Sequence, residues 1–272
     1  YKYYIKGKKI KRTKAVFVEV RFDEITDSFR LVYDRMKADG FDVHEQFIEN
    51  IKPGKWGYIK RCLRMLEDIS DAYYVFLNDA CNVTSCIPLR KGTKIYQLWH
   101  ACGAFKKFGM STAELIFGDN RKSLEKYPNY GNLSYVTVSS PEVIWAYEEA
   151  MNLKDTKTQV VATGVSRTDV FYDQHFIEQS KAAVYSVCPA AENKKIILYA
   201  PTFRGRVAKA ESPDCLDIPA MKRALGDEYV LLIKHHPFVK QPPVVPEDCA
   251  DFAMDVTKSL EIDQLLCASD VC

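Results

Sequence analysis

The chain has 272 residues, of which 47% are hydrophobic and 27% are charged, so it holds enough apolar material for one large domain or two smaller ones. The formal net charge of +2 is far from the basic excess of nucleic-acid-binding domains, and we expect no nucleic-acid partner. No uninterrupted apolar run reaches the length of about 18 residues that a membrane-spanning helix needs, so none is predicted.

The nine cysteines are scattered through the chain, with no CxxC pair and no Cys/His cluster at zinc-ligand spacing. This pattern is typical of reduced thiols in a cytoplasmic protein, and it predicts no intrinsic metal site. The sequence also has no GxGxxG, GxxxxGK[ST] or GxSxG motif. Dinucleotide-binding, P-loop and nucleophile-elbow sites are therefore not expected, and neither is a bound cofactor.

Residues 1–14 form a leader in which seven basic side chains alternate with Tyr and Ile. Such a segment can lie on an anionic membrane surface, and we expect peripheral attachment to a membrane. The alternative is a solvated terminal tail.

Downstream of the leader, short apolar strands alternate with amphipathic helices. The expected strands cover residues 15–20, 41–48, 72–77, 95–99, 134–138 and 159–162, and the expected helices cover 27–37, 56–69, 141–153 and 173–185. The run at 72–77 is continuously apolar, as in a strand buried on both faces of a parallel sheet. The pattern predicts a doubly wound α/β domain over residues 15–188.

The strand at 95–99 ends at Trp99 and is followed by His100, a small-residue turn, and the adjacent cations Lys106 and Lys107. Ligands of doubly wound sheets bind at the carboxyl ends of strands, where His100 is expected. A histidine beside cations suits a base next to an anion. The alternatives are a histidine bonded to backbone at the edge of the core, and two solvated lysines at a helix start.

After residues 189–193 the pattern restarts, with strands at 195–200, 229–233 and 251–256 and helices at 218–225 and 260–266. Residues 269–272 have the composition of the beginning of a further strand. We expect a second domain over residues 189–272 that is similar to the first but incomplete.

The second half also has polar residues after its strands, with Thr202 and Arg204 after one and Lys234, His235, His236 and Pro237 after the next. Two such strand ends facing each other would form a cleft suited to a phosphorylated or nucleotide-linked group, because Arg binds phosphate through two hydrogen bonds and Lys acts as a point charge. The alternatives are surface cations and a structural histidine pair.

Five motifs, in this order along the chain, resemble the CDP-glycerol glycerophosphotransferase family, which comprises teichoic acid primases and polymerases. They are Leu98-Trp99-His100 with Lys106, Lys107 and Gly109; Gly164-Val165-Ser166-Arg167-Thr168-Asp169; Tyr199-Ala200-Pro201-Thr202-Phe203-Arg204; Lys234-His235-His236-Pro237; and Ser269-Asp270-Val271. The resemblance extends from about Ala15 to the end of the chain.

The resemblance implies a GT-B fold, with two Rossmann-like domains around a cleft. It implies that His100 is the general base on the acceptor hydroxyl and that His236 and Arg204, with Lys234, Thr202 and Arg167, hold the phosphates of CDP-glycerol. The resemblance further implies that the acceptor-side residues are Trp99, Lys106 and Lys107. The acceptor would be lipid-linked, the reaction would release CMP at the cytoplasmic face of the membrane, and a homo-oligomer is possible.

The first motif differs from the family's usual WHGTPLK, because this chain continues from His100 as Ala101-Cys102-Gly103-Ala104-Phe105-Lys106. The family's DYSS-like donor motif, which follows the SDV strand, lies beyond Cys272. Two alternatives therefore stand beside the phosphotransferase: a GT-B glycosyltransferase that uses a nucleotide sugar, and a non-catalytic membrane-associated domain of the same fold.

Overall fold

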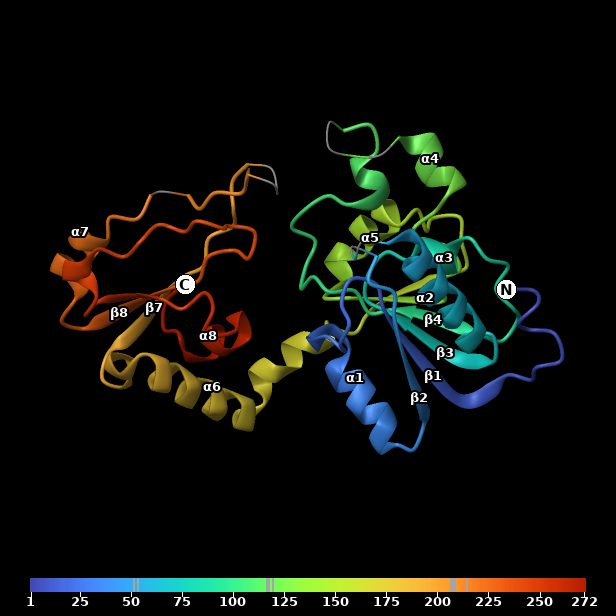
Figure 1. Ribbon diagram of the computed structural model, residues 1–272, viewed down its shortest axis with the longest axis horizontal. Coiled ribbons are helices and arrows are strands. Elements are labelled where there is room, and N and C mark those ends of the chain that lie inside the picture. Colours follow the sequence, from blue (N-terminus) through green and yellow to red (C-terminus); the bar gives the residue numbers. More distant parts are fainter. Residues whose placement is uncertain (51, 53, 116–117, 119, 206–208, 214) are drawn as a thin grey trace. The chain divides into compact units, whose positions relative to one another are not determined.

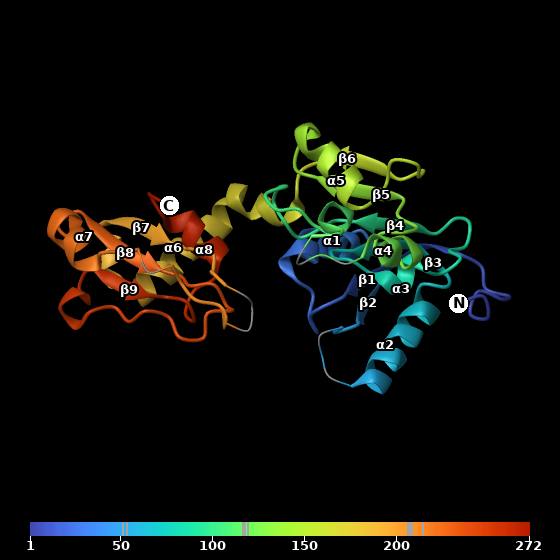
Figure 2. The ribbon, with the colours of Figure 1, turned by 90° about the horizontal axis from the view of Figure 1, so that it is seen from above.

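The computed structural model describes residues 1–50, 52, 54–115, 118, 120–205, 209–213 and 215–272. The chain divides into two compact units, unit 1 (Tyr1–Asp169) and unit 2 (Val170–Cys272), each with its own parallel sheet (Figures 1 and 2). Within these described segments, no helix combines the length and the apolar character needed to cross a membrane.

Unit 1 contains a six-stranded parallel sheet in the order β2-β1-β3-β4-β5-β6. Its strands are β1 (Lys11–Glu19), β2 (Asp42–Phe47), β3 (Ala72–Leu77), β4 (Lys94–Gln97), β5 (Tyr135–Val138) and β6 (Gln159–Ala162). Its helices are α1 (Asp27–Ala38), α2 (Lys55–Asp68), α3 (Asn82–Ser85), α4 (Arg121–Lys126) and α5 (Ile144–Ala150). The sequence predicted these six strands but not their order in the sheet, and the doubly wound α/β domain is confirmed.

Both faces of this sheet are buried, which explains why β3 and residues 15–18 of β1 are apolar without interruption. Successive side chains of a strand point to opposite faces, so Val16 and Val75 pack in one core with Met65 of α2. Phe17 packs on the other face against Phe29 of α1, with ring centroids 5.2 Å apart. The carboxyl ends of all six strands therefore lie at one edge of a sheet held rigidly from both sides.

Unit 2 contains a three-stranded parallel sheet in the order β7-β8-β9, formed by β7 (Lys195–Tyr199), β8 (Tyr229–Ile233) and β9 (Ala253–Asp255). Its helices are α6 (Gln174–Val187), α7 (Ile218–Leu225) and α8 (Ile262–Ala268). Val271 forms a parallel bridge with Ile197 of β7, and the Asp270 carboxylate accepts a hydrogen bond from the Ile196 amide at 2.8 Å. Val271 thus pairs with the edge of β7 by an isolated bridge, in the segment where the sequence predicted strand structure.

The boundary between the units lies earlier than the sequence suggested. We expected it between Cys188 and Pro189, but the structure divides the chain after Asp169. The reason is the packing of α6, because Val184 is completely buried in the same core as Ile196 of β7 and Leu265 of α8. A helix that follows the strands of unit 1 in sequence therefore belongs to the core of unit 2.

The basic leader also ends earlier than the predicted residue 14, because β1 begins at Lys11. The Lys14 side chain is only 5% exposed, and its ammonium lies 2.7 Å from carboxylate oxygens of both Asp68 and Asp71. Burial alone lowers the pKa of Lys14, but hydrogen bonds and attraction from the two carboxylates outweigh burial and raise it. Burial likewise raises the pKa of Asp71, and hydrogen bonds from Lys14 and Lys11 outweigh that effect and lower it.

Replacement of Lys14 by methionine is expected to lower the free energy of unfolding by about 3 kcal/mol at pH 7, because two poorly hydrated carboxylates lose their shared cation. Lys11→Met is the matched control. Its side chain is 57% exposed and contacts only Asp71, at 3.1 Å, so a loss below about 1 kcal/mol is expected. Urea titrations of the variants give both values.

The pH dependence follows from the two shifts. Since the pKa of Asp71 is lowered, its stabilisation is present above the unfolded-state value of about 4 and is lost as the pH falls through the folded-state value. Since the pKa of Lys14 is raised, its contribution persists up to about pH 10 and is lost above that. The difference between wild type and Lys14→Met should therefore shrink below about pH 4, and a difference that grows there would contradict this account.

Candidate functional site

The edge of unit 1 at which the strands end is organised by the turn after β4. Trp99 has a left-handed φ of +62°, so the strand stops at Gln97, two residues earlier than the sequence predicted. The Gln97 side chain holds the turn, since its amide donates to the Asp79 carbonyl at 2.9 Å and its oxygen accepts from the Trp99 backbone amide at 3.1 Å. This turn directs the chain into His100 beside the end of β3.

The tautomer of His100 follows from its partner. Its Nδ1 lies 2.8 Å from the carbonyl oxygen of Asn78, and because a carbonyl can only accept, Nδ1 carries the proton and donates it. In the neutral ring, Nε2 then keeps its lone pair and can accept a proton. The ring also stacks on Trp99, with centroids 4.5 Å apart, which fixes its plane.

Asn78 is in turn held by a buried carboxylate. Glu19, at the end of β1, is 1% exposed and accepts hydrogen bonds from the Asn78 side-chain amide and the Thr26 backbone amide, each at 2.9 Å. The Thr26 hydroxyl also donates to Glu19, so it makes no capping bond to α1. Glu19 thus connects the ends of β1 and β3 with the start of α1, and Asn78 carries this constraint to His100.

A pocket of about 330 Å³ lies beside His100. Its lining residues are Glu19, Arg21, Phe22, Thr26, Asp27, Ser28, Asn78, Asp79, His100 and Arg167. Arg21 forms an ion pair with Asp79, which also accepts from the Ala80 amide at 2.6 Å. The pocket therefore combines a candidate base with two arginines and three carboxylates.

Arg167 belongs to this pocket in unit 1. The sequence grouped it with the donor-phosphate residues, but the others of that group lie in unit 2. Its loop is anchored to α1, since the Ser166 hydroxyl donates to the Ser28 carbonyl at 3.1 Å. We therefore assign Arg167 to the surroundings of His100.

The predicted acceptor-side residues divide into two groups. Trp99 is 6% exposed and acts as a platform, packing against His100 on one side and Phe108, with centroids 4.7 Å apart, on another. Lys106 and Lys107 are exposed and do not line the pocket of His100. The structure therefore supports a positioning role for Trp99 and brings neither lysine to the base.

In unit 2, Thr202 and Arg204 follow β7 and are both exposed. Arg204 exchanges two backbone hydrogen bonds with Glu211, at 2.8 and 3.0 Å, which pins the loop. The Arg204 guanidinium lies 3.2 Å from the Thr202 carbonyl and 3.3 Å from the Phe203 carbonyl. The pair therefore forms one exposed, cationic corner at the carboxyl end of β7.

His236, at the end of β8, has the opposite tautomer from His100. The Phe238 amide donates to its Nδ1 at 3.2 Å, so the proton of the neutral ring lies on Nε2, which can donate to an anion. Its ring packs against Phe203 and Phe238, with centroids 4.7 and 4.8 Å away. Phe203 precedes Arg204 directly, so the structure brings His236 and the corner at the end of β7 together.

The two neighbours of His236 have structural contacts. The Lys234 ammonium donates hydrogen bonds to the carbonyls of Thr257 and Leu260, so these carbonyls hold it in place. His235 is 4% exposed and lies 2.9 Å from the Ser212 hydroxyl. Of the predicted donor-side residues, the structure therefore groups Thr202, Arg204 and His236, with Lys234 behind them.

Among the residues of the pocket beside His100 that sequence reasoning missed are four polar ones: Glu19, Arg21, Asn78 and Asp79. All four come at or just after the ends of β1 and β3, and that position was the available signal. Glu19 lay in a predicted strand, where a polar residue among apolar ones is ordinary. Its role depends on a contact with Asn78, 59 positions away.

Comparison with known proteins gives the context for this site. The model of the family described as CDP-Glycerol:Poly(glycerophosphate) glycerophosphotransferase matches residues 2–272. The chain is 32% identical over 266 residues to a teichoic acid ribitol-phosphate primase of Bacillus spizizenii, and the match covers 96% of this chain and 67% of that protein. It is 34% identical to a teichoic acid poly(ribitol-phosphate) polymerase of the same organism, over 96% of this chain and 42% of the polymerase.

A teichoic acid glycerol-phosphate primase of Bacillus subtilis is 30% identical over 75% of this chain and 49% of the primase. The solved structure of the wall teichoic acid polymerase TagF matches with a TM-score of 0.67 at 18% identity, over 96% of this chain and 65% of the TagF chain. This likeness confirms the GT-B-like fold, and the chain spans about two thirds of that protein. By its sequence and its fold, the chain belongs to the CDP-glycerol:poly(glycerophosphate) glycerophosphotransferase family.

Proposed function

We propose that this chain carries out the transfer of a polyol phosphate from a CDP-linked donor to a hydroxyl of a lipid-linked acceptor, with release of CMP. The observation that carries the proposal is the hydrogen bond from His100 Nδ1 to the Asn78 carbonyl, because it leaves Nε2 as a proton acceptor in a pocket lined by Arg21 and Arg167. The family relationship supplies the reaction class.

In the proposed reaction, the acceptor hydroxyl oxygen attacks the phosphorus of the polyol phosphate while His100 Nε2 takes the hydroxyl proton. A new P–O bond forms to the acceptor, and the P–O bond to the cytidine-linked phosphate breaks. The bonding electrons leave with CMP. Catalysis by one positioned base and fixed positive charge suits phosphoryl transfer, in which positioning and charge stabilisation provide most of the rate.

We assign the donor phosphates to unit 2. Arg204 provides a fixed positive charge that can bind phosphate through two parallel hydrogen bonds, and His236 offers its Nε2 proton from a ring held by Phe203 and Phe238. Thr202 contributes a hydroxyl at the same corner, and no bound cofactor is required by this scheme.

The donor expected from the motifs is CDP-glycerol. CDP-ribitol is the second candidate, because the relatives with ribitol-phosphate names are 32% and 34% identical over 96% of this chain, whereas the glycerol-phosphate primase of Bacillus subtilis matches 75% of it. The two donors differ in the length of the polyol and share the CDP group on which Arg204 and His236 are proposed to act.

The leader fits attachment to a membrane. Lys2, Lys6 and Lys9 are exposed, and Tyr3 is 84% exposed beside them. Lys8 instead donates to the Ser70 hydroxyl at 3.0 Å, which ties this segment to the body of unit 1. An exposed cationic and aromatic segment held on a folded domain suits the anionic inner face of a cell membrane, where a lipid-linked acceptor would be reached.

The transfer is tested by measuring CMP release from CDP-glycerol, CDP-ribitol and a UDP-sugar in the presence of a lipid-linked acceptor. Release from a CDP-polyol is expected, and release of UDP alone would favour a glycosyltransferase instead.

His100→Ala should lower kcat by about 10²- to 10⁴-fold, because the acceptor hydroxyl loses its base. His175→Ala, an exposed histidine on α6 bonded to Gln179, is the control and should retain activity. Unchanged turnover in His100→Ala would remove His100 from the mechanism.

Glu19→Gln tests whether the network behind His100 matters for turnover. A glutamine has one acceptor oxygen in place of two, so its amide must face either Asn78 or Thr26, both of which donate. We expect kcat to fall about 10- to 100-fold through misplacement of His100, with KM for the CDP-polyol little changed. Glu24→Gln, on an exposed glutamate of the adjoining loop, is the control. A loss of thermal stability with normal kcat would mean that Glu19 is only structural.

The membrane role of the leader is tested by vesicle flotation with phosphatidylglycerol-containing liposomes. Changing Lys2, Lys6 and Lys9 to Glu should weaken vesicle binding by tenfold or more, since each lysine near an anionic surface contributes about 1 kcal/mol. The matched control changes the exposed residues Lys181, Lys209 and Lys240 of unit 2 to Glu. Equal binding by wild type and leader variant would show that the leader is a solvated tail.

A further inference from the structure

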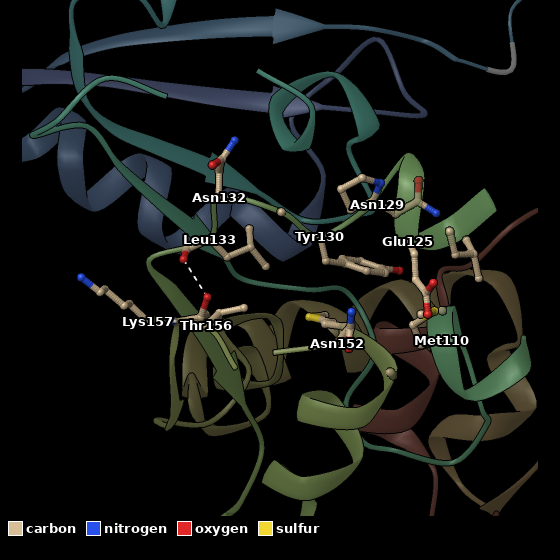
Figure 3. Close-up of a pocket in the computed structure, with 16 residues that line it drawn as sticks. Met110, Glu125, Asn129, Tyr130, Asn132, Leu133, Asn152, Thr156 and Lys157 are labelled. Carbon is tan, nitrogen blue, oxygen red and sulfur yellow. Dashed lines mark hydrogen bonds between the residues drawn. The ribbon is translucent and has the colours of Figure 1, made fainter. Parts of the chain in front are cut away.

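Unit 1 has a second pocket, of about 470 Å³, with no counterpart in the proposed reaction (Figure 3). Leu133 and Thr158 line it, and they precede β5 and β6, so part of the pocket lies near the amino ends of these strands. His100 follows the carboxyl end of β4 and does not line it. Its size falls within the range of ordinary small-molecule sites.

The walls of this pocket are fixed before any ligand enters. The Asn132 amide donates to the carbonyls of Thr84, Ser85 and Ile87, at 2.9, 3.3 and 2.7 Å. The Thr158 hydroxyl donates to the Leu133 carbonyl at 2.8 Å. A pocket whose loops are held in this way pays little ordering entropy on binding.

The close approach of Gly109 to α5 closes one side of the pocket. Its φ is +53°, and a Cβ atom at this position would lie 2.2 Å from the carbonyl oxygen of Ala150. No other residue type fits there without movement of the backbone. Met110, next in the chain, is thereby held at the end of the pocket beside Glu125 (Figure 3).

The charges in the pocket argue against a phosphate ligand. Among the lining residues, the ionised side chains are Glu125 and Lys157, which sum to zero and stand at opposite ends in Figure 3. The corner at the end of β7, to which we assign the donor phosphates, contains Arg204. A site for an anion would be expected to carry such an excess of positive charge.

The neutral polar groups match hydroxyl groups instead. Within the described residues, the side-chain amides of Asn129 and Asn152 make no hydrogen bond, and each offers donors and an acceptor to the pocket. Between them lies the ring of Tyr130 (Figure 3), and burial raises the pKa of its hydroxyl, which keeps that group neutral. An apolar ring with amides around it suits a ligand that has CH groups on one face and hydroxyls on its rim.

A neighbouring pocket of about 500 Å³ extends this surface, because it shares Met110 and Asn152 as lining residues. It contains Trp145 of α5, whose side chain is 67% exposed, although Trp side chains are mostly buried in folded proteins. An exposed indole face beside Glu148 and Glu149 offers a second apolar platform with hydrogen-bond acceptors around it.

We infer that the pocket around Asn129, Tyr130 and Asn152 binds a neutral polyhydroxylated ligand, either a sugar ring or an uncharged polyol portion of a chain. The inference rests on the shape and polarity of the pocket and does not require the transferase assignment. The role of this ligand does rest on the proposed function: because the pocket lies away from His100, it would hold a part of the acceptor or product that does not react.

The test measures binding of N-acetylglucosamine, ribitol and inorganic phosphate by saturation-transfer NMR, with affinities from tryptophan fluorescence. Binding of the sugar or of ribitol is expected, and which of them binds identifies a glycan or a polyol chain as the source of the ligand. Phosphate binding that competes with them, or no binding of either up to about 100 mM, would overturn the inference.

The double variant Asn129→Ala/Asn152→Gly should weaken this binding about tenfold or more, since it removes two hydrogen-bonding side chains. Glycine is chosen because Asn152 has a φ of +55°, which glycine adopts without strain. Asn50→Ala, on an exposed asparagine outside the pocket, should bind normally. Affinity within twofold of wild type in the double variant would overturn the inference. Normal binding by His100→Ala separates this pocket from the reaction site.

Discussion

The buried carboxylate of Glu19 is the constraint on which the arrangement around His100 depends. A carboxylate that is 1% exposed is costly unless its oxygens accept hydrogen bonds, and here Asn78 and Thr26 supply them. These bonds connect the end of β1, the end of β3 and the start of α1. The Asn78 carbonyl then accepts a hydrogen bond from Nδ1 of His100. The bonds that satisfy the buried Glu19 therefore also fix the group that selects the tautomer of His100.

The two candidate histidines differ in tautomer for a reason that lies in their backbones. His100 faces a carbonyl oxygen and must donate from Nδ1, whereas His236 faces the amide of Phe238 and must accept at Nδ1. The first ring is therefore suited to take a proton and the second to give a hydrogen bond to an anion. Two histidines of the same residue type thus acquire different chemistry from one neighbouring backbone group each.

Much of the fold could be predicted from the sequence, because it depends on local patterns. The apolar run at residues 72–77 and the polar residues that follow each strand predicted a parallel sheet and the edge at which the candidate site lies. The boundary between the units could not be predicted, since α6 is equally compatible with either half until Val184 is seen to pack against Ile196. The end of the leader was misplaced because Lys14 is buried by Asp68 and Asp71, which are more than fifty positions away.

The candidate site shows the same division between local and distant information. His100, Arg204 and His236 could be proposed as candidates because each lies in the loop that follows a strand. Arg167 was predicted as a candidate residue but grouped with the donor phosphates, because its position in the pocket of His100 comes from a loop tied to α1 by the bond from Ser166 to Ser28. Glu19 could not be identified at all, since an acidic residue at the end of a strand is ordinary until its partners are known. The candidate base and the candidate phosphate-binding residues thus follow local patterns, whereas the residues that orient them depend on the tertiary fold. The structure is therefore needed most for buried polar side chains such as Glu19, because their partners cannot be read from the sequence.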